Sequence, residues 1–394
     1  MRVLHVVTAY PRYPGDPIVP WLAELIRRLR QRGVDAEIIT SSYRGGGNRE
    51  HDGVPVHRFR YAPAAWERLT HEENAADRAS RSPLFAMVSV AYIAAGIMAI
   101  RRLVRARRYD VVHVHWPVPH ALMGIAAQRT AKLPMVTTYY GAELRLAARS
   151  RVFTRLLRAA ARRSARNAAI SRHTADDLTR LTGVTAEIIP YSIAFTPHAR
   201  STTTAERPFT VLFVGRLVAR KGVPVLLEAW AQAALPNAKL VIVGGGPDRD
   251  ALEARSASLG VDANIDFRGR VSDEELASAY STADLFVLPA VLDARGDTEG
   301  LGVVLLEAMA SHVPVLASAA GGITDVIVDG ESGILVPPGD AAALSNALRR
   351  VAGDPALRAT LAANGARRVR EHFSWDAIAD RWAEVYREAV RAPH

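Results

Sequence analysis

Residues 297–309 read DTEGLGVVLLEAM, a Gly-rich turn that runs directly into an apolar helical segment. Glu299 lies in the turn, and Glu307 follows about two helical turns later, so the two carboxylates lie near one helix face. Glycines let backbone N–H groups come close to a ligand, and the helix N-terminus behind them favours an anion. The pattern suits a ligand with hydroxyls at both ends and phosphate between them, which is the layout of a nucleotide sugar.

Together with residues 308–340, this pattern resembles the signature of retaining GT-B glycosyltransferases of the GT4 type, and the resemblance covers nearly the whole chain. It implies an α/β chain with two Rossmann-like domains whose parallel sheets face each other across a cleft. The implied reaction moves a sugar from a UDP- or GDP-type nucleotide sugar, with retained anomeric configuration and without a metal or other cofactor. The implied acceptor is a glycan, a lipid-linked molecule or a small molecule, and the motif variants favour bacterial polysaccharide or cell-envelope synthesis.

The resemblance also implies roles for individual residues. Glu299 would bind hydroxyls of the donor sugar, and Glu307 would bind the ribose. In the loop GRLVARKG at residues 215–222, an arginine and a lysine five residues apart could both reach a diphosphate. Arg216 and Lys221 would then stabilise charge on the leaving group, so that Arg216, Lys221 and Glu299 form the catalytic set. Further donor contacts are expected at Gly15, Gly215, Arg270, Val271, Gly300, Leu301, Gly302 and Val303.

Composition and charge restrict the possible partners. A chain of 394 residues is expected to form two domains, and the absence of cysteine excludes disulfides and thiolate metal sites. The net charge of +10 favours anionic partners, namely nucleic acid, anionic lipid or phosphorylated substrates. Because no nucleic-acid recognition motif accompanies the charge, we expect no nucleic-acid partner. Met1–Thr8 predicts a buried strand and not a signal peptide, so we expect a cytoplasmic protein, with peripheral attachment to the inner membrane face as an option.

Alternating apolar strands and amphipathic helices extend along both halves of the chain and predict parallel sheets. The boundary is expected near residue 200, in a Thr-rich linker. The predicted domains are 1–200 on the acceptor side and 201–374 on the donor side, with a terminal helix over 375–394 returning to the first domain. Strands are predicted at Val3–Thr8, Ala36–Thr40, Val54–Arg60, Asp110–His115, Pro134–Thr138, Phe209–Val214, Lys239–Val243 and Leu285–Pro289, and helices at Trp21–Arg32 and Leu84–Arg108.

Two segments of the first half carry candidate acceptor-side residues. The run HVHWPVPHAL at residues 113–122 resembles a segment of GT4 relatives, and it places His115 and His120 at the carboxyl end of a predicted strand. Tyr140 and Glu143 follow the next strand. The family usually has histidine where this chain has Tyr140, and tyrosine is a poor base at neutral pH.

Two patterns were considered as metal sites. His113 and His115 point to one side of a predicted strand, but without a third ligand nearby we expect no metal there. Asp248 and Asp250 match an Asp-x-Asp pattern, but they fall at a predicted helix start, where acids stabilise the helix dipole. The sequence therefore predicts no metal site.

A basic helix is predicted over Leu144–Ala169, with Arg151, Arg155, Arg158, Arg162 and Arg166 along one face. Two interpretations stay open: a solvated face over a core stripe, or a surface that meets anionic lipid. The uncharged segment Leu84–Ile100 is expected to be a core or interfacial helix and not a membrane span.

Three other functions were weighed. A phosphorylase of the same fold would need a lysine for pyridoxal phosphate, and no lysine has that setting. A non-catalytic nucleotide-sugar-binding protein or membrane-associated scaffold would keep the binding groups, and Tyr140 is the one feature that favours it. A nucleic-acid-binding protein would fit only the charge.

Overall fold

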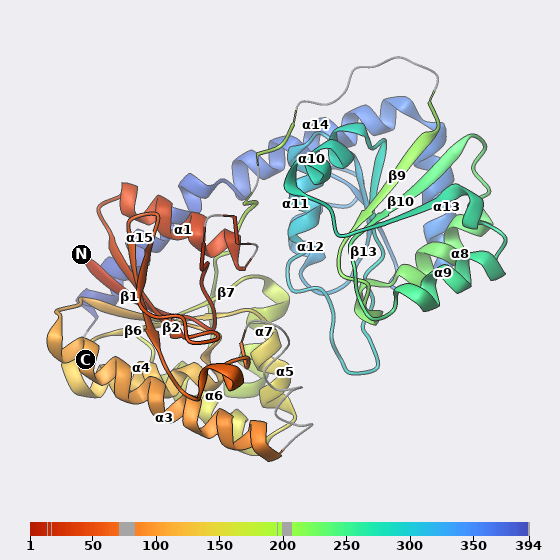
Figure 1. Cartoon of the computed structure of the whole chain (residues 1–394). Coiled ribbons are helices and arrows are strands. Elements are labelled where there is room, and N and C mark those ends of the chain that lie inside the picture. Colours follow the sequence, from red (N-terminus) through yellow and green to blue (C-terminus); the bar gives the residue numbers. More distant parts are fainter. Residues whose placement is uncertain (14, 17, 71–82, 195, 199–206, 393–394) are drawn as a thin grey trace. The chain divides into compact units, whose positions relative to one another are not determined.

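The computed structural model describes residues 1–392 except 14, 17, 71–82, 195 and 199–206. The chain forms two compact units, each a sheet with helices on its faces (Figure 1). Unit 1 comprises Met1–Tyr191 and Trp375–His394, and unit 2 comprises Ser192–Ser374. The division after Tyr191 lies a few residues before the boundary predicted near residue 200.

The sheet of unit 1, called sheet A, has the strand order β3-β4-β2-β1-β5-β6-β7-β8 and is parallel except for the β3–β4 pair. From β1 the chain builds outward through β2 and β4, and then returns to the other side of β1 with β5. This reversal beside β1 is the switch point where open α/β sheets bind ligands. The strands are β1 (Arg2–Val6), β2 (Asp35–Ser41), β3 (Arg49–His51), β4 (Val54–Phe59), β5 (Val111–His115), β6 (Met135–Tyr139), β7 (Arg166–Ala169) and β8 (Glu187–Ile188).

Helices cover both faces of sheet A because successive strand residues point to opposite faces. Val3 packs into a core with helices α1 and α15, whereas its neighbour Leu4 packs into a core with α3 and α4. Ion pairs from Arg28 and Arg32 to Asp376 and Asp380 also join α1 to the terminal helix α15. The helices are α1 (Pro20–Gln31), η1 (Ala64–Trp66), α3 (Pro83–Ala106), α4 (Pro117–Ala131), α5 (Ala142–Ala148), α6 (Arg151–Arg163), α7 (Arg172–Thr182) and α15 (Trp375–Arg391).

The predicted single helix over Leu144–Ala169 is wrong. The structure has two helices, α5 and α6, followed by strand β7. The Ser150 hydroxyl accepts a hydrogen bond from the backbone N–H of Phe153 and so caps the start of α6. Arg166–Ala169 pairs in parallel with β6, which places Arg166 in the sheet and not on the basic helix.

Helix α3 holds the one candidate membrane span within the described residues. Met87–Ala106 is long and apolar enough to cross a membrane by length and composition alone, and 28% of its most apolar window is buried. Tyr92, Ile100 and Val104 pack into the core of unit 1, while Met87 and Val90 are exposed. Such helices also occur as core helices of soluble proteins, so this feature is weak support for a span.

The sheet of unit 2, called sheet B, is fully parallel with the strand order β11-β10-β9-β12-β13-β14. This is the Rossmann order, and its switch point lies between β9 and β12. The strands are β9 (Phe209–Val214), β10 (Ala238–Val243), β11 (Ile265–Gly269), β12 (Leu285–Leu288), β13 (Val315–Ser318) and β14 (Ile334–Val336). The helices are η2 (Ala219–Lys221), α8 (Val223–Ala233), α9 (Arg249–Ser258), η3 (Asp262–Asn264), α10 (Asp273–Thr282), α11 (Val303–Ala310), α12 (Ile323–Val326), α13 (Ala341–Gly353) and α14 (Pro355–His372).

Candidate functional site

The predicted donor residues of unit 2 gather at the carboxyl edge of sheet B. Gly215 and Arg216 follow β9, Arg270 and Val271 follow β11, and the loop with Glu299 follows β12. Because β9 and β12 are neighbours, the two loops meet at the switch point, where the Val291 N–H donates to the Arg220 carbonyl at 2.9 Å. The sheet thus brings together groups that the sequence separates.

An ion pair lies at this switch point. The Lys221 ammonium donates to Oε2 of Glu299, and both residues are less than 10% exposed. Arg220 also reaches Oε2 of Glu299 at 3.4 Å and Oδ2 of Asp297 at 3.4 Å. Arg220 was not among the predicted site residues, because only the fold shows that its side chain turns towards Glu299.

Glu299 is ionised despite its burial. Burial by itself raises the pKa of this carboxyl, but the charges of Lys221 and Arg220 and the Gly302 N–H lower the pKa below its usual value. The lysine has three donors and uses one on Glu299, so two stay available for a ligand. The pair therefore combines a fixed negative acceptor with a cation that can still bind phosphate oxygens.

Glycines fix the backbone around Glu299. Gly302 has a φ of +83° and begins α11, a conformation that side chains with a Cβ rarely adopt. A Cβ on Gly321 would lie 2.1 Å from the Glu299 carbonyl oxygen, and the Gly322 N–H donates to that oxygen at 2.9 Å. The Gly-Gly pair after β13 is thus the sequence signal of a loop packed against the site.

Glu307 lies on α11, below the turn. The Tyr280 hydroxyl donates to Oε2 of Glu307 at 2.7 Å. Burial raises the pKa of Glu307 to about 7, and this hydrogen bond together with the charge of Lys221 only partly opposes the shift. Tyr280 is a partner that the sequence analysis did not identify, since it comes from helix α10.

The remaining predicted donor residues differ in position. Arg216 and Arg270 are exposed at the carboxyl edge of sheet B. Gly15 belongs to unit 1, where it is exposed in the loop after β1 with a φ of +79°. The predicted donor set is therefore divided between the two units.

At the switch point of sheet A, three histidines form a buried cluster. His5 of β1 joins His113 and His115 of β5, and one ring nitrogen from each lies within 4.8 Å of the others. The premise that no third imidazole lies nearby is therefore wrong, because parallel pairing sets His5 beside His113. Burial lowers the pKa of all three, to about 3 for His5, so the rings are neutral.

Hydrogen bonds already engage five of the six ring nitrogens in this cluster. Nδ1 of His5 pairs with Nε2 of His115 at 3.1 Å, and Nδ1 of His115 pairs with the Tyr140 hydroxyl at 2.7 Å. His113 pairs with the hydroxyls of Tyr386 and Thr138 at 2.8 and 2.7 Å. A bound ion would have to break some of these hydrogen bonds. The absence of a metal at the histidines stays a prediction, and it now rests on these hydrogen bonds instead of on a missing third ligand.

An aromatic group lies above the cluster. The Tyr140 ring stacks on Trp116 at 4.4 Å, and Trp21 stacks on Tyr191 at 4.6 Å and lies 5.2 Å from Tyr140. All four residues are partly exposed, and Trp116 has a φ of +50°, which is uncommon for a side chain of this size. Burial raises the pKa of Tyr140 well above its usual value, so its hydroxyl is a hydrogen-bonding group and not a base.

Glu143 and His120 lie beside this group. Oε1 of Glu143 accepts the Tyr140 N–H at 2.6 Å, whereas its other oxygen is buried without a hydrogen-bond partner. Burial raises the pKa of Glu143 to about 7. His120 is buried, and it pairs with the Tyr92 hydroxyl at 2.8 Å and with the Trp116 carbonyl at 2.9 Å. Its bonds therefore hold the Trp116 loop against α3.

The basic face of α6 consists of four exposed arginines, Arg151, Arg155, Arg158 and Arg162. Leu157, Ala160 and Ala161 form the buried face. Arg166 is only partly exposed and pairs with Glu388 of α15 at 2.9 Å. The predicted stripe is thus shorter by one arginine.

Two family models match adjacent parts of the chain. Glycosyltransferase Family 4 matches residues 20–193, and Glycosyl transferases group 1 matches residues 195–368. The GDP-mannose-dependent alpha-(1-6)-phosphatidylinositol monomannoside mannosyltransferase of Mycolicibacterium smegmatis is 30% identical, over 84% of this chain and 91% of that protein. An uncharacterized glycosyltransferase of Methanocaldococcus jannaschii is 38% identical over 46% of this chain, and the match spans only 45% of that protein's length.

Solved structures with the same fold match the whole chain. Sucrose-phosphate synthase from Thermosynechococcus elongatus has a TM-score of 0.78 at 24% identity, over all of both chains. An Anabaena protein in complex with UDP and glucose has a TM-score of 0.71 at 20% identity, over 98% of each chain. At these identities the likeness shows the fold alone, and it confirms the two Rossmann-like domains of the GT-B prediction. With the family matches and the full-length mannosyltransferase relative, this chain belongs to the group 1, GT4-type family of glycosyltransferases.

Proposed function

We propose that this glycosyltransferase transfers a sugar with retained configuration from a UDP- or GDP-type nucleotide sugar. The observation that carries the proposal is the buried pair of Lys221 and Glu299 at the switch point of sheet B. Glu299 accepts hydrogen bonds from hydroxyls of the donor sugar. The two free donors of Lys221, together with the exposed Arg216, bind the diphosphate.

In this mechanism, the cations stabilise the charge that grows on the leaving diphosphate as the glycosidic bond breaks. A phosphate oxygen of the leaving group takes the acceptor proton, so no side chain has to act as a base. This fits the hydroxyl of Tyr140, whose raised pKa prevents it from acting as one. Because arginine and lysine supply the positive charge, we propose that turnover needs no metal ion.

Glu307 binds the ribose hydroxyls, and the backbone at Arg270 and Val271 binds the base. Glu307 lies on α11, next to the turn that holds Glu299, so one helix and its turn contribute to both ends of the donor. The main-chain groups of Gly215, Gly300, Leu301, Gly302 and Val303 complete the donor side in unit 2.

The acceptor binds on the side of unit 1. Trp116 and Tyr140 offer aromatic faces for a sugar or polyol ring, and His115 orients the Tyr140 hydroxyl. One carboxyl oxygen of Glu143 has no hydrogen-bond partner among the described residues, and it can accept a hydrogen bond from a hydroxyl of the acceptor. The relative from Mycolicibacterium smegmatis, which matches nearly full length, is named for a phosphatidylinositol monomannoside acceptor, and this supports a lipid-linked acceptor.

We further propose a cytoplasmic protein that attaches peripherally to anionic membrane through Arg151, Arg155, Arg158 and Arg162 on the basic face of α6. The exposed Met87 and Val90 of α3 would add apolar contact from the same unit. The attachment is electrostatic and reversible, because each arginine near an anionic surface contributes about 1 kcal/mol.

A donor screen tests the proposed function. Each nucleotide sugar is added to the purified full chain, and the unfolding temperature is measured, since a ligand that binds the folded state stabilises it. The stabilising donor is then incubated with the protein in chelator, and the anomeric configuration of the product is read by NMR. Binding without hydrolysis or transfer would favour the non-catalytic binding protein, and inversion would contradict the proposed stereochemistry.

A further inference from the structure

A pocket opens at the carboxyl edge of sheet A, between the loops that follow β1 and β2 and residues of strands β3 and β4. Its volume is about 260 Å³, and the described residues that line it include no Asp or Glu. The charged and aromatic members of the lining are Arg12, Arg44, Arg49, Arg58, Tyr13 and Tyr43. Four arginines around so small a space form a strong local positive charge.

Arg58 is the buried member of this group. It is 9% exposed, and its Nη2 donates to the carbonyls of Tyr10 and Pro11 at 3.1 and 2.9 Å. Its Nη1 is buried and has no hydrogen-bond partner among the described residues. A buried guanidinium nitrogen without an acceptor is costly, and an anion in the pocket would remove that cost.

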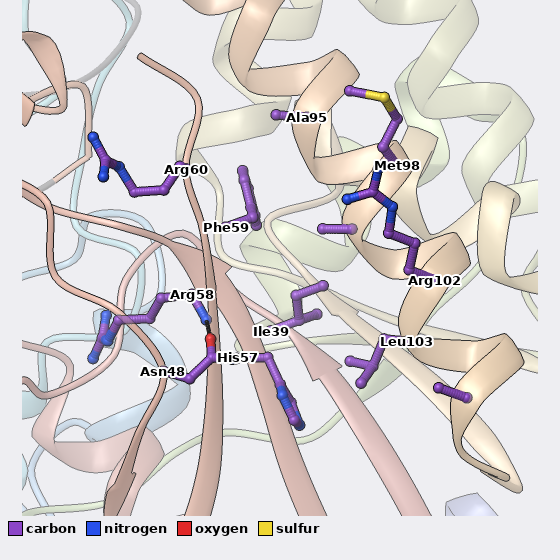
Figure 2. A pocket seen from close by; sticks show the side chains of 12 residues that line it. Ile39, Asn48, His57, Arg58, Phe59, Arg60, Ala95, Met98, Arg102 and Leu103 are labelled. Atoms are coloured by element: carbon purple, nitrogen blue, oxygen red, sulfur yellow. Dashed lines mark hydrogen bonds between the residues drawn. The ribbon is translucent and has the colours of Figure 1, made fainter. Parts of the chain in front are cut away.

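Arg58 lines both this pocket and the larger pocket beside α3, but its side chain points away from α3. Figure 2 shows that it leaves strand β4 on the side away from Met98, Arg102 and Leu103 of α3. Alternation along β4 gives the same result, since Val56 packs against the α1 and α15 side and Phe59 against the α3 side.

The other arginines are held in place around it. Asp16 binds Arg12 through contacts of 2.6 and 3.2 Å, so it offsets one of the four charges. The Tyr43 ring lies 5.0 Å from the Arg12 guanidinium and 5.2 Å from that of Arg44. Burial, and to a lesser extent the charges of Arg12 and Arg49, lower the pKa of Arg58 to about 10.

We propose that this arginine pocket binds a phosphate group of the acceptor, which rests on the proposed glycosyl transfer. Arginine forks match phosphate oxygens with paired hydrogen bonds, and several forks can share one doubly charged anion. The pocket lies on the same edge of sheet A as Tyr140 and Glu143. The acceptor is therefore a phosphorylated sugar or polyol, or a lipid-linked phosphate.

The test measures phosphate binding separately from the donor site. In the full chain carrying Arg216→Ala, Lys221→Met and Glu299→Gln, the donor diphosphate site is disabled without leaving Glu299 as a buried charge, and inorganic phosphate is titrated by calorimetry. Arg58→Met should weaken phosphate binding about tenfold to a hundredfold, the effect of losing a charged hydrogen bond. Arg49→Gln should weaken it less, and Arg129→Gln, an exposed arginine of α4 with the same charge change, should leave it unchanged.

Absence of phosphate binding in the parent protein, or equal binding by the Arg49, Arg58 and Arg129 variants, would overturn the proposal. If circular dichroism shows that Arg58→Met does not fold, the comparison of Arg49→Gln with Arg129→Gln decides. Donor affinity, measured separately with a nucleoside diphosphate in the otherwise unmodified chain, reports on the proposed function, so the two failures are distinguishable.

The source of the phosphate is then tested by displacement. Bound phosphate is challenged with myo-inositol phosphate and with farnesyl phosphate, and unphosphorylated inositol and farnesol serve as controls. Displacement by the inositol compound alone assigns a soluble acceptor, and displacement by the farnesyl compound alone assigns a lipid-linked one. If each unphosphorylated control displaces as well as its phosphate, the pocket does not recognise the phosphate and the proposal fails.

Discussion

At the carboxyl edge of sheet B, the switch point holds charged groups in an ion pair, Lys221 with Glu299. At the same edge of sheet A, the switch point holds neutral imidazoles, His5, His113 and His115, with aromatic rings above them. The strand arrangement is alike, so the fold does not determine the chemistry. A diphosphate leaving group needs fixed positive charge, whereas a hydroxyl acceptor needs hydrogen bonds and flat apolar surface.

The arginine pocket qualifies this comparison. It lies at the carboxyl edge of sheet A, between the loops after β1 and β2 and residues of β3 and β4, whereas the neutral cluster lies on strands β1 and β5. If the arginine pocket binds phosphate, unit 1 has a positively charged subsite in this pocket and a neutral subsite at the histidines and aromatic rings. The experiments below test whether the ion pair at the edge of sheet B and the neutral groups at the edge of sheet A are needed for function.

Removing the lysine of the charged edge should have the largest effect. Lys221→Ala should lower turnover about a hundredfold to a thousandfold, because a transition-state donor is lost. It should also destabilise unit 2 by about 1–3 kcal/mol, because buried Glu299 loses its nearest cation and keeps the longer contact to Arg220 at 3.4 Å. Activity assays at saturating substrate measure the loss of turnover, and urea unfolding measures the loss of stability. The exposed Arg216→Ala should lower turnover about tenfold to a thousandfold without the loss of stability.

A double variant separates catalysis from stability. Lys221→Met with Glu299→Gln removes both charges and should recover most of the stability but none of the turnover. Recovery of turnover in the double variant, or full turnover in Lys221→Ala, would contradict the diphosphate role of the lysine.

The two glutamates of the charged edge should separate kinetically. Glu299→Gln should lower kcat/KM for the nucleotide sugar about a hundredfold and leave affinity for the free nucleoside diphosphate unchanged. Glu307→Gln should weaken binding of the free nucleotide by about tenfold, because the carboxyl contact to the ribose hydroxyls is lost. Calorimetry with the nucleoside diphosphate provides the readout. Equal losses of nucleotide affinity in both variants would show that Glu299 and Glu307 do not have separate roles.

One pH experiment compares a buried carboxyl from each edge. The pKa values of Glu143 and Glu307 are raised to about 7 from 4.5 in the unfolded state, so the folded protein binds more protons between these values. Stability should therefore fall as the pH rises from about 4.5 through 7. Each group should contribute on the order of 1–3 kcal/mol, measured by urea unfolding at pH 5 and pH 8.

Glu143→Gln and Glu307→Gln should each flatten this pH dependence, because an amide does not ionise. Asp262→Asn, which changes an exposed acid of η3, serves as the control for loss of a carboxyl. Unchanged pH profiles in both glutamate variants would show that the two edges do not hold these carboxyls in protonated form.

The smallest effect per residue is expected on the basic face of α6. The wild-type chain should sediment with anionic vesicles at low salt and not with neutral ones, and salt should release it. Arg155→Gln, Arg158→Gln and Arg162→Gln together should abolish sedimentation and leave nucleotide binding by unit 2 intact. Arg166→Gln is the matched control, since Arg166 pairs with Glu388 and should add little. If the wild-type chain ignores anionic vesicles, the four arginines form a solvated face.

The sequence by itself determined the alternation of strands and helices and the motif residues of the charged edge. Apolar strand runs and helical periodicity are local properties, and Arg216, Lys221, Glu299 and Glu307 lie in short motifs with their own glycines. Helix Leu144–Ala169 was mispredicted because a basic, alanine-rich segment has helical periodicity throughout. Only pairing with β6 makes residues 166–169 a strand.

The tertiary structure alone decided which distant side chains meet. Arg220 turns to Glu299, Tyr280 donates to Glu307, and His5 completes the histidine cluster because β1 pairs in parallel with β5. Likewise, the sequence predicts only that Arg58 is a basic residue within a strand. It becomes the buried cation of a pocket only where the loops after β1 and β2 fold over the end of β4. Local pattern fixes each element, but which elements become neighbours depends on burying their apolar faces together, and that is a property of the whole chain.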